Sequence, residues 1–305
     1  MHTARAPFNT AKADIVIRSS DNVYFRVFRC LLALASPFFD AMFDLPRPLT
    51  EIPDYETYDG LEVIPMTEGS RTIDMMLRFC YPVPSVGSPR LDNLTDIENL
   101  LEAAIKYSMD GIEKKASEAL ISRHLLEKEP LRVFAIAYRY RLEREARIAA
   151  RYTLHKSPFP LDSPELRYIP PQDRLKLAEY RKKSSAAIRY LTTSLEWIKR
   201  SETHQFYEWW TSCCQCRSKC DVRYLLHSTY AREWWAEYME ESTTALQERP
   251  CGQVVSEPLT KALERANECP ACRRRAYTQM MEFTTRFADE IEKTITEVSG
   301  CFHPS

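Results

Sequence analysis

Glycine is scarce in this sequence, with 6 residues in a chain of 305. Loops that cradle phosphate groups need several glycines close together, so their scarcity argues against a nucleotide-binding loop. The sequence also contains neither the Gly-x-Ser-x-Gly turn of serine hydrolases nor the His-Glu-x-x-His pair of zinc proteases. His124, His155 and His204 have no acidic partner at a recognisable spacing. We therefore expect a protein that is not an enzyme.

Excess charge and long apolar runs are lacking as well. The 42 basic and 43 acidic residues give a formal net charge of −1, so attraction to nucleic acid would require a local patch. The longest apolar run, from Cys30 to Phe39, is too short to span a membrane, and the N-terminus has no secretory core segment. We expect a cytoplasmic or nuclear protein whose 10 Cys are thiols or metal ligands.

The stretch from Asp14 to Phe43 is rich in apolar residues, and its period changes along the way. Ile-Val-Ile follows Asp14, turn-forming residues occupy 19–22, and apolar residues alternate from Val23 to Val27. This pattern predicts a β-hairpin over 14–28. The residues after it predict a short buried helix formed by Leu31, Leu32, Leu34 and Ala35.

A second short helix is expected directly afterwards. Ser36 can accept hydrogen bonds from its first amides, and Pro37 suits its first turn. The apolar face of this helix comprises Phe38, Phe39, Met42 and Phe43.

The following region predicts one more strand and three helices. Residues 61–66 read as a strand that ends at Pro65 or lies at a sheet edge. Ser70 is expected to cap a helix that Pro82 ends, and Thr95-x-x-Glu98 is expected to begin another as a capping box. That helix has an apolar face of Ile97, Leu101, Ala104 and Ile105, and a further helix follows the break at 109–111.

This order of elements resembles the BTB/POZ domain, in the form common among fungal proteins. The resemblance implies an α+β fold, in which helices cap a small three-stranded sheet and a mainly α-helical C-terminal domain follows. Phe28 departs from the pattern, because the family often has His there. The matching residues are Asp14, Phe25, Val27, Arg29, Leu31-Leu32-Ala33, Ser36-Pro37-Phe38-Phe39, Met42-Phe43, Phe79-Cys80-Tyr81-Pro82, Ala103-Ala104, Tyr107 and Met109.

We divide the chain into four parts. Residues 13–125 correspond to the BTB/POZ domain, and 126–156 form a helical extension that begins near Pro130. The Pro-rich stretch 157–172 reads as a linker. Residues 173–305 read as a helical domain that contains Cys-x-x-Cys pairs and ends in a helix over about 257–298.

The resemblance also implies an interface. In the family, an acid and a base at the positions of Asp14 and Arg29 lie near a pocket at the dimer axis. With Leu31, Phe38 and Phe39, they are the expected interface residues of a homodimer. The alternative is a monomeric domain in which Asp14 only caps the start of the strand.

Two Cys-x-x-Cys pairs suggest a structural zinc site. Each pair can direct two thiolates to one ion, so Cys213, Cys216, Cys269 and Cys272 are the expected ligands. Cys251 or Cys220 could substitute for one of them. The alternative is that all are thiols packed among Trp residues. A thioredoxin-like redox site is disfavoured, because neither pair follows a strand in a βαβ unit.

Two other clusters are expected to be structural. The pairs Trp209-Trp210 and Trp234-Trp235 are expected in a helix-packing core, with an exposed partner groove as the alternative. The three arginines 273–275 are expected at a solvated helix start, with phosphate contacts as the alternative.

These features together favour a non-enzymatic interaction protein. The resemblance implies homodimers or assemblies with other BTB proteins, and a helical region that binds a client protein. Within the family such proteins act as adaptors on a cullin-type ubiquitin ligase scaffold or in transcriptional regulation. The alternative hypothesis is a zinc-dependent transcriptional regulator that binds nucleic acid.

Overall fold

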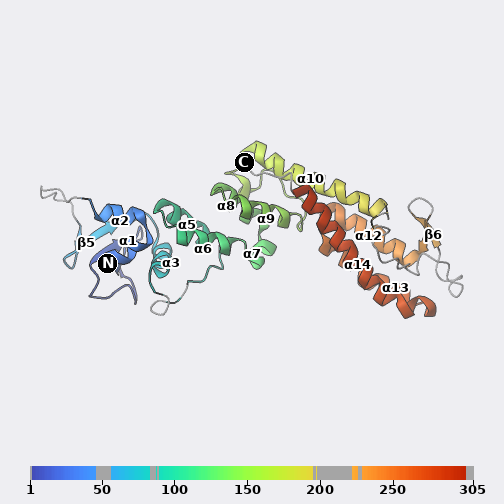
Figure 1. Ribbon diagram of the computed structural model, residues 1–305, viewed down its shortest axis with the longest axis horizontal. Coiled ribbons are helices and arrows are strands. Elements are labelled where there is room, and N and C mark those ends of the chain that lie inside the picture. Colours follow the sequence, from blue (N-terminus) through green and yellow to red (C-terminus); the bar gives the residue numbers. More distant parts are fainter. Residues whose placement is uncertain are drawn as a thin grey trace. The chain divides into compact units, whose positions relative to one another are not determined.

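The computed structural model describes residues 2–45, 56–82, 87, 89–194, 197, 222–225 and 229–299. The chain forms two compact units, Met1–Glu145 and Ala146–Ser305, which we call unit 1 and unit 2. Figure 1 shows unit 1 in blue to green and unit 2 in green to red. Among the helices of the described residues, none combines the length and apolar character needed to cross a membrane.

Unit 1 contains a sheet with the strand order β1-β3-β2-β5-β4. The predicted hairpin is confirmed, because β2 and β3 are antiparallel with Ile15 opposite Val27. The predicted third strand, β5, is parallel to β2 and ends at Pro65. Two-residue strands β1 and β4, which the sequence did not predict, lie at the edges. The bounds are β1 His2–Thr3, β2 Ile15–Arg18, β3 Val23–Val27, β4 Thr57–Tyr58 and β5 Leu61–Pro65.

Helices surround this sheet. The two short helices and the Ser36-Pro37 junction are found where the sequence predicts them. The bounds in unit 1 are α1 Arg29–Ala35, α2 Pro37–Phe43, α3 Ser70–Cys80, α5 Leu94–Lys106, α6 Asp110–Leu120, α7 Arg123–Lys128 and α8 Pro130–Arg139, and α9 Glu143–Thr153 crosses into unit 2.

Two predicted helix caps are wrong. Ser70 is the first residue of α3, and its amide and hydroxyl donate hydrogen bonds to Asp21, at 2.8 and 2.6 Å. Asn93, rather than Thr95, caps α5, because its side chain accepts from the amide N–H groups of Thr95 and Asp96. Ile105 also differs from the prediction, because its side chain is exposed.

Unit 2 is mainly helical, with a core that includes Trp235, Tyr238, Phe283 and Phe287. The predicted single helix over 257–298 is wrong. Proline lacks an amide N–H and disfavours helical geometry in the residue before it, so one helix ends before Pro270 and another begins there. The bounds are η1 Pro164–Leu166, α10 Pro171–Thr193, β6 Val222–Leu225, β7 Thr229–Arg232, α12 Glu233–Glu248, η3 Gly252–Ser256, α13 Leu259–Asn267 and α14 Pro270–Ser299.

The stretch predicted as a linker, 157–172, lies within unit 2, and the boundary between the units falls in α9. Leu166 and Ile169 are buried, so this stretch is anchored to unit 2. The guanidinium of Arg181 on α10 donates hydrogen bonds to the carbonyls of Thr153, Lys156 and Glu248. It thereby ties α10 to the end of α9 and to the end of α12.

Candidate functional site: an apolar surface on two short helices

The most exposed large hydrophobic side chain that the structure describes is Leu34 on α1, with 85% of its surface accessible. Phe38, in the first turn of α2, is 43% exposed, and Leu31 is half-buried. We call these three residues the α1/α2 surface. The prediction that Leu34 is buried is therefore wrong. Leu31, Leu32, Leu34 and Ala35 surround much of a seven-residue helix, and unit 1 covers only the side that carries Leu32.

Ser36 fixes the junction between the two helices. Its side chain accepts a hydrogen bond from the amide N–H of Phe39 at 3.1 Å, and its hydroxyl donates to the carbonyl of Tyr107 at 2.5 Å. The side chain of Ser36 is buried, so both bonds are shielded from water. The predicted cap is confirmed, and the second bond attaches α2 to the end of α5.

Aromatic packing supports the surface from below. Phe39 is 1% exposed, and its ring is stacked on that of Tyr107, with 5.1 Å between centroids. The ring of Phe38 packs edge-on against Phe39 and Tyr107, in both cases with 5.4 Å between centroids. Phe38 is thus held with part of its ring facing solvent. Phe39, an expected interface residue, lies in the core and can only support such an interface.

Tyr107 is itself fixed by charged neighbours. Its hydroxyl donates to a carboxylate oxygen of Glu68 at 2.7 Å, and Lys106 donates to the other oxygen at 2.8 Å. Burial raises the pKa of Glu68, but hydrogen bonds, chiefly from Lys106 and Tyr107, and the positive charge of Lys106 together outweigh it, so the net pKa is lowered. Burial raises the pKa of Tyr107 to about 12, so this hydroxyl keeps its proton at neutral pH.

Asp14 and Arg29 are neighbours, but their side chains do not pair with each other. A carboxylate oxygen of Asp14 accepts from the backbone N–H of Arg29, the first residue of α1, at 2.8 Å. The guanidinium of Arg29 instead pairs with Glu62 at 2.5 Å and lies over the ring of Phe43, 5.2 Å from its centroid. Both residues therefore fix the position of α1 relative to the sheet and to α2.

The cysteine prediction falls partly outside the described residues. Cys213, Cys216 and the possible substitute Cys220 lie there. Cys269 precedes α14 and is buried, and Cys272 is half-buried in its first turn. Both are thiols rather than a disulfide. Within the described ranges, no group of three or more His, Cys, Asp or Glu side chains is placed to hold a metal ion.

Cys251 cannot share an ion with Cys272. The amide of Gly252, next to Cys251, donates to Glu292 at 2.7 Å. Glu292 lies 20 residues along α14 from Cys272, which corresponds to about 30 Å of helix. Metal–thiolate bonds are about 2.3 Å long, so this separation removes Cys251 as a substitute ligand.

The other two predicted clusters are structural where they are described. Trp234 and Trp235 are buried in unit 2, as expected, whereas Trp209 and Trp210 lie outside the described residues. The three arginines 273–275 are exposed in the first turns of α14, which confirms the predicted solvated helix start.

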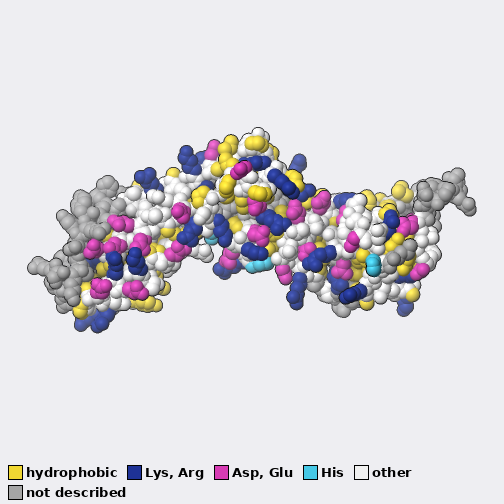
Figure 2. Space-filling view, turned by 180° about the vertical axis from the view of Figure 1, so that it is seen from behind, with side chains coloured by type: hydrophobic (Ala, Val, Ile, Leu, Met, Phe, Trp, Pro, Cys, Tyr) yellow, Lys and Arg dark blue, Asp and Glu magenta, His cyan; other side chains and the backbone are white. Residues whose placement is uncertain are grey.

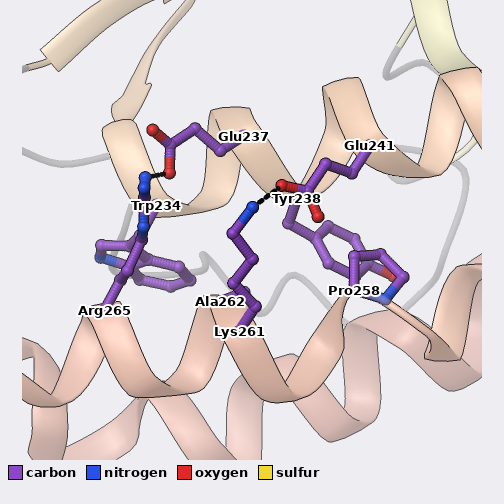
Figure 3. Close-up of a pocket in the computed structure, with 8 residues that line it drawn as sticks. All are labelled: Trp234, Glu237, Tyr238, Glu241, Pro258, Lys261, Ala262 and Arg265. Carbon is purple, nitrogen blue, oxygen red and sulfur yellow. Dashed lines mark hydrogen bonds and ion pairs between the residues drawn. The ribbon is translucent and has the colours of Figure 1, made fainter.

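A crevice between α12 and α13 is closed by side chains. Figure 3 shows two ion pairs that bridge these helices, Glu237 with Arg265 and Glu241 with Lys261, beside the ring of Trp234. The crevice has no room for a water molecule. It therefore joins two helices and does not provide a ligand site.

Comparison with protein families identifies part of unit 1. Residues 7–124 match the family model described as the BTB/POZ domain. The match covers strands β2 to β5, α1, α2 and the helices as far as the start of α7, and so includes the whole α1/α2 surface, whereas β1 precedes it. A comparison with curated proteins found no match.

Proposed function

Because residues 7–124 form a BTB/POZ domain, a family of protein-interaction modules, we propose that the protein self-associates through the α1/α2 surface. The observation that carries this proposal is the exposure of Leu34 and Phe38 on helices held in place by buried contacts. A rigid apolar surface loses little conformational freedom on binding, so its burial contributes efficiently to affinity. Another BTB domain with a similar surface is the alternative partner.

A symmetric dimer uses the same patch on both copies, so each apolar residue contributes twice. Burying one leucine or phenylalanine side chain contributes about 1.5–3 kcal/mol. The Leu34 and Phe38 side chains of two copies therefore supply a substantial driving force. Asp14 and Arg29 act indirectly in this proposal, because they fix the helix that presents Leu34.

Light scattering of the full chain at micromolar concentration tests the proposal. The wild-type protein is expected to have twice the mass of one chain, and Leu34→Glu is expected to be monomeric. Leu175→Glu is a matched control, because Leu175 is an exposed leucine of unit 2. A monomeric wild-type protein, or a Leu34→Glu variant that remains dimeric, contradicts the proposal.

We further propose that unit 2 recognises a client protein and that the assembly acts as an adaptor for a cullin-type ubiquitin ligase. The alternative is a zinc-dependent transcriptional regulator that binds nucleic acid. The formal net charge of −1 favours the adaptor role, because it provides no overall attraction to nucleic acid. Co-purification of the full chain with a cullin-type scaffold supports the adaptor role. Salt-sensitive binding to DNA without scaffold binding supports the regulator instead.

We also propose a structural zinc ion held by Cys213, Cys216, Cys269 and Cys272. The two described ligands support this, because Cys269 directly precedes α14 and Cys272 lies in its first turn, and a Cys-x-x-Cys spacing can direct two thiolates to one ion. The helix N-terminus favours the thiolate forms. With four protein ligands, such an ion has no open position for a substrate and serves to hold segments together.

A further inference from the structure

Four of the large exposed hydrophobic residues of unit 2 lie on α10 or on the segment just before it. Leu161, Tyr168, Leu175 and Tyr190 are 40%, 60%, 52% and 54% exposed. Figure 2 shows hydrophobic side chains gathered at the surface around the start of α10, with Lys and Arg side chains farther along the helix. We call Leu161, Tyr168, Leu175, Lys182, Lys183 and Arg189 the α10 platform.

Arg174 holds the apolar end of the platform together. Its guanidinium donates hydrogen bonds to the carbonyls of Ile169, Arg167 and Leu161, at 2.7, 3.1 and 3.3 Å. One guanidinium thus ties the backbone that carries Leu161 and Tyr168 to the first turns of α10, where Leu175 directly follows Arg174. The guanidinium of Arg167 also lies 4.5 Å from the centroid of the Tyr168 ring. The backbone before α10 is therefore fixed to this helix, and the ring of Tyr168 is in contact with Arg167.

The rest of the platform is basic. Leu175, Lys182 and Arg189 are spaced seven residues apart, which places them on one stripe of the helix with about 10.5 Å between neighbours. Glu179 is the one exposed acidic residue of α10, and Lys176 is already paired with Asp173 at 2.7 Å. Among the described residues, no carboxylate pairs with Lys182, Lys183 or Arg189.

We propose that the α10 platform binds an acidic segment of a partner protein that carries apolar side chains at one end. Carboxylates two helical turns apart would face Lys182 and Arg189, and a leucine or similar side chain would cover Leu175 and Tyr168. This inference rests on the proposal that unit 2 recognises a client, and it specifies the chemistry of that client.

The apolar end of the platform favours a protein over nucleic acid. Leu161 and Leu175 offer no hydrogen bond to a phosphate or a base, whereas they fit an apolar side chain. Phosphate contacts alone would use only the basic stripe. A second copy of this chain is a weaker candidate, since the exposed acids Glu240 and Glu248 on α12 are not accompanied by a large exposed apolar residue of that helix.

Fluorescence anisotropy with labelled peptides and the full chain tests the proposal. The probe is a peptide of Leu-Glu-Glu-Ala-Leu-Glu-Glu repeats, and the matched peptides have Ser in place of Leu or Lys in place of Glu. We expect the acidic, leucine-containing peptide to bind at least tenfold more tightly than either control. Raising the salt concentration should weaken this binding, because salt screens surface charges.

Variants then locate the binding site. Leu175→Glu and the double variant Lys182→Glu/Lys183→Glu are each expected to weaken peptide binding about tenfold. Lys114→Glu/Lys115→Glu reverses an exposed lysine pair on α6, in which Lys115 pairs with Glu118, and should bind like the wild type. Leu34→Glu should bind the peptide like the wild type but lose self-association. The proposed peptide site and the proposed dimer are therefore tested independently of each other.

Three outcomes overturn the proposal. Equal binding of the acidic and basic peptides shows that the platform does not select charge. If the wild type binds a short DNA duplex but not the peptide, and Lys182→Glu/Lys183→Glu loses the DNA binding, the basic residues of the platform bind nucleic acid instead. Dissociation of a larger assembly into smaller ones by Leu175→Glu assigns the platform to a second copy.

Discussion

The carboxylate of Asp14 accepts a hydrogen bond from the backbone N–H of Arg29, with 2.8 Å between oxygen and nitrogen. This bond joins the residue before β2 to the first turn of α1, which Leu34 follows. We predict that Asp14→Ala lowers the free energy of unfolding of unit 1 by about 1 kcal/mol, the usual cost of losing a helix cap. Asp14→Asn retains an acceptor oxygen and should lose less.

Urea unfolding measures this effect, and the five Trp residues help to assign it. All five lie at or after position 197, in unit 2, so Trp fluorescence reports that unit. Circular dichroism reports both units. A shift of the circular-dichroism transition with an unchanged fluorescence transition locates the loss in unit 1. Unchanged unfolding of Asp14→Ala would show that the bond contributes nothing to stability.

Asp21 gives a prediction for the dependence of stability on pH. Hydrogen bonds from the side chains of Ser19 and Ser70 lower its pKa from 3.8 to about 2. The ionised carboxylate is thus favoured in the folded state, so it stabilises unit 1 fully above pH 3.8. This contribution is lost as the pH falls from 3.8 towards 2.

Asp21→Asn is therefore expected to lower stability at pH 6 and to flatten the dependence of stability between pH 4 and pH 2. Urea midpoints measured across this range provide the test. Asp92→Asn is a suitable control, since the side chain of Asp92 is exposed and only its backbone carbonyl accepts a hydrogen bond. Identical slopes for Asp21→Asn and the wild type would contradict the assignment.

Local sequence signals predicted much of unit 1. The hairpin, the Ser36 cap and the start of α2 at Pro37 depend on neighbouring residues, so their patterns are visible in the sequence. The cap of α3 is different, because Asp21 reaches Ser70 from 49 positions away. A residue so distant in sequence is placed by the tertiary fold, and the local pattern pointed to Ser70 itself.

The two candidate surfaces, the α1/α2 surface and the α10 platform, also depend on contacts that the local sequence pattern does not reveal. The sequence marked Leu34 as apolar but could not say which side of α1 the rest of unit 1 covers. The α10 platform was missed because a Pro-rich stretch reads as a linker, whereas Arg174 fixes it to the helix through the backbone carbonyls of residues 5, 7 and 13 positions earlier. The break at Pro270 did have a signal, since proline within a helical pattern marks an end.

Arg181 provides a prediction for unit 2. It is 9% exposed and donates to three backbone carbonyls, and burial lowers the pKa of its guanidinium. Arg181→Met removes the donor of all three bonds, of which the bond to Thr153 is buried and the other two are part-buried, so we expect a loss of about 3 kcal/mol. Lys183→Met, on the exposed face of α10, should change stability by less than about 0.5 kcal/mol.

The fluorescence-detected urea midpoint compares these two variants directly. A lower midpoint for Arg181→Met at an unchanged slope is expected, because the slope reflects the surface exposed on unfolding. Equal midpoints for the two variants would show that the bridge to Thr153, Lys156 and Glu248 does not stabilise unit 2.

The proposed zinc site can be tested by substituting Cys272, a proposed ligand, and Cys251, which lies too far from Cys272 to bind the same ion. Purified protein is expected to contain about one zinc ion per chain, since four thiolates complete a tetrahedral structural site. Cys272→Ser should lose the ion and expose the remaining thiols to alkylation. Cys251→Ala should retain it, because Cys251 lies near Glu292, about 30 Å along the helix from Cys272. Elemental analysis and thiol counting measure both effects. Metal-free protein with reduced thiols, or zinc loss from Cys251→Ala alone, contradicts this ligand set.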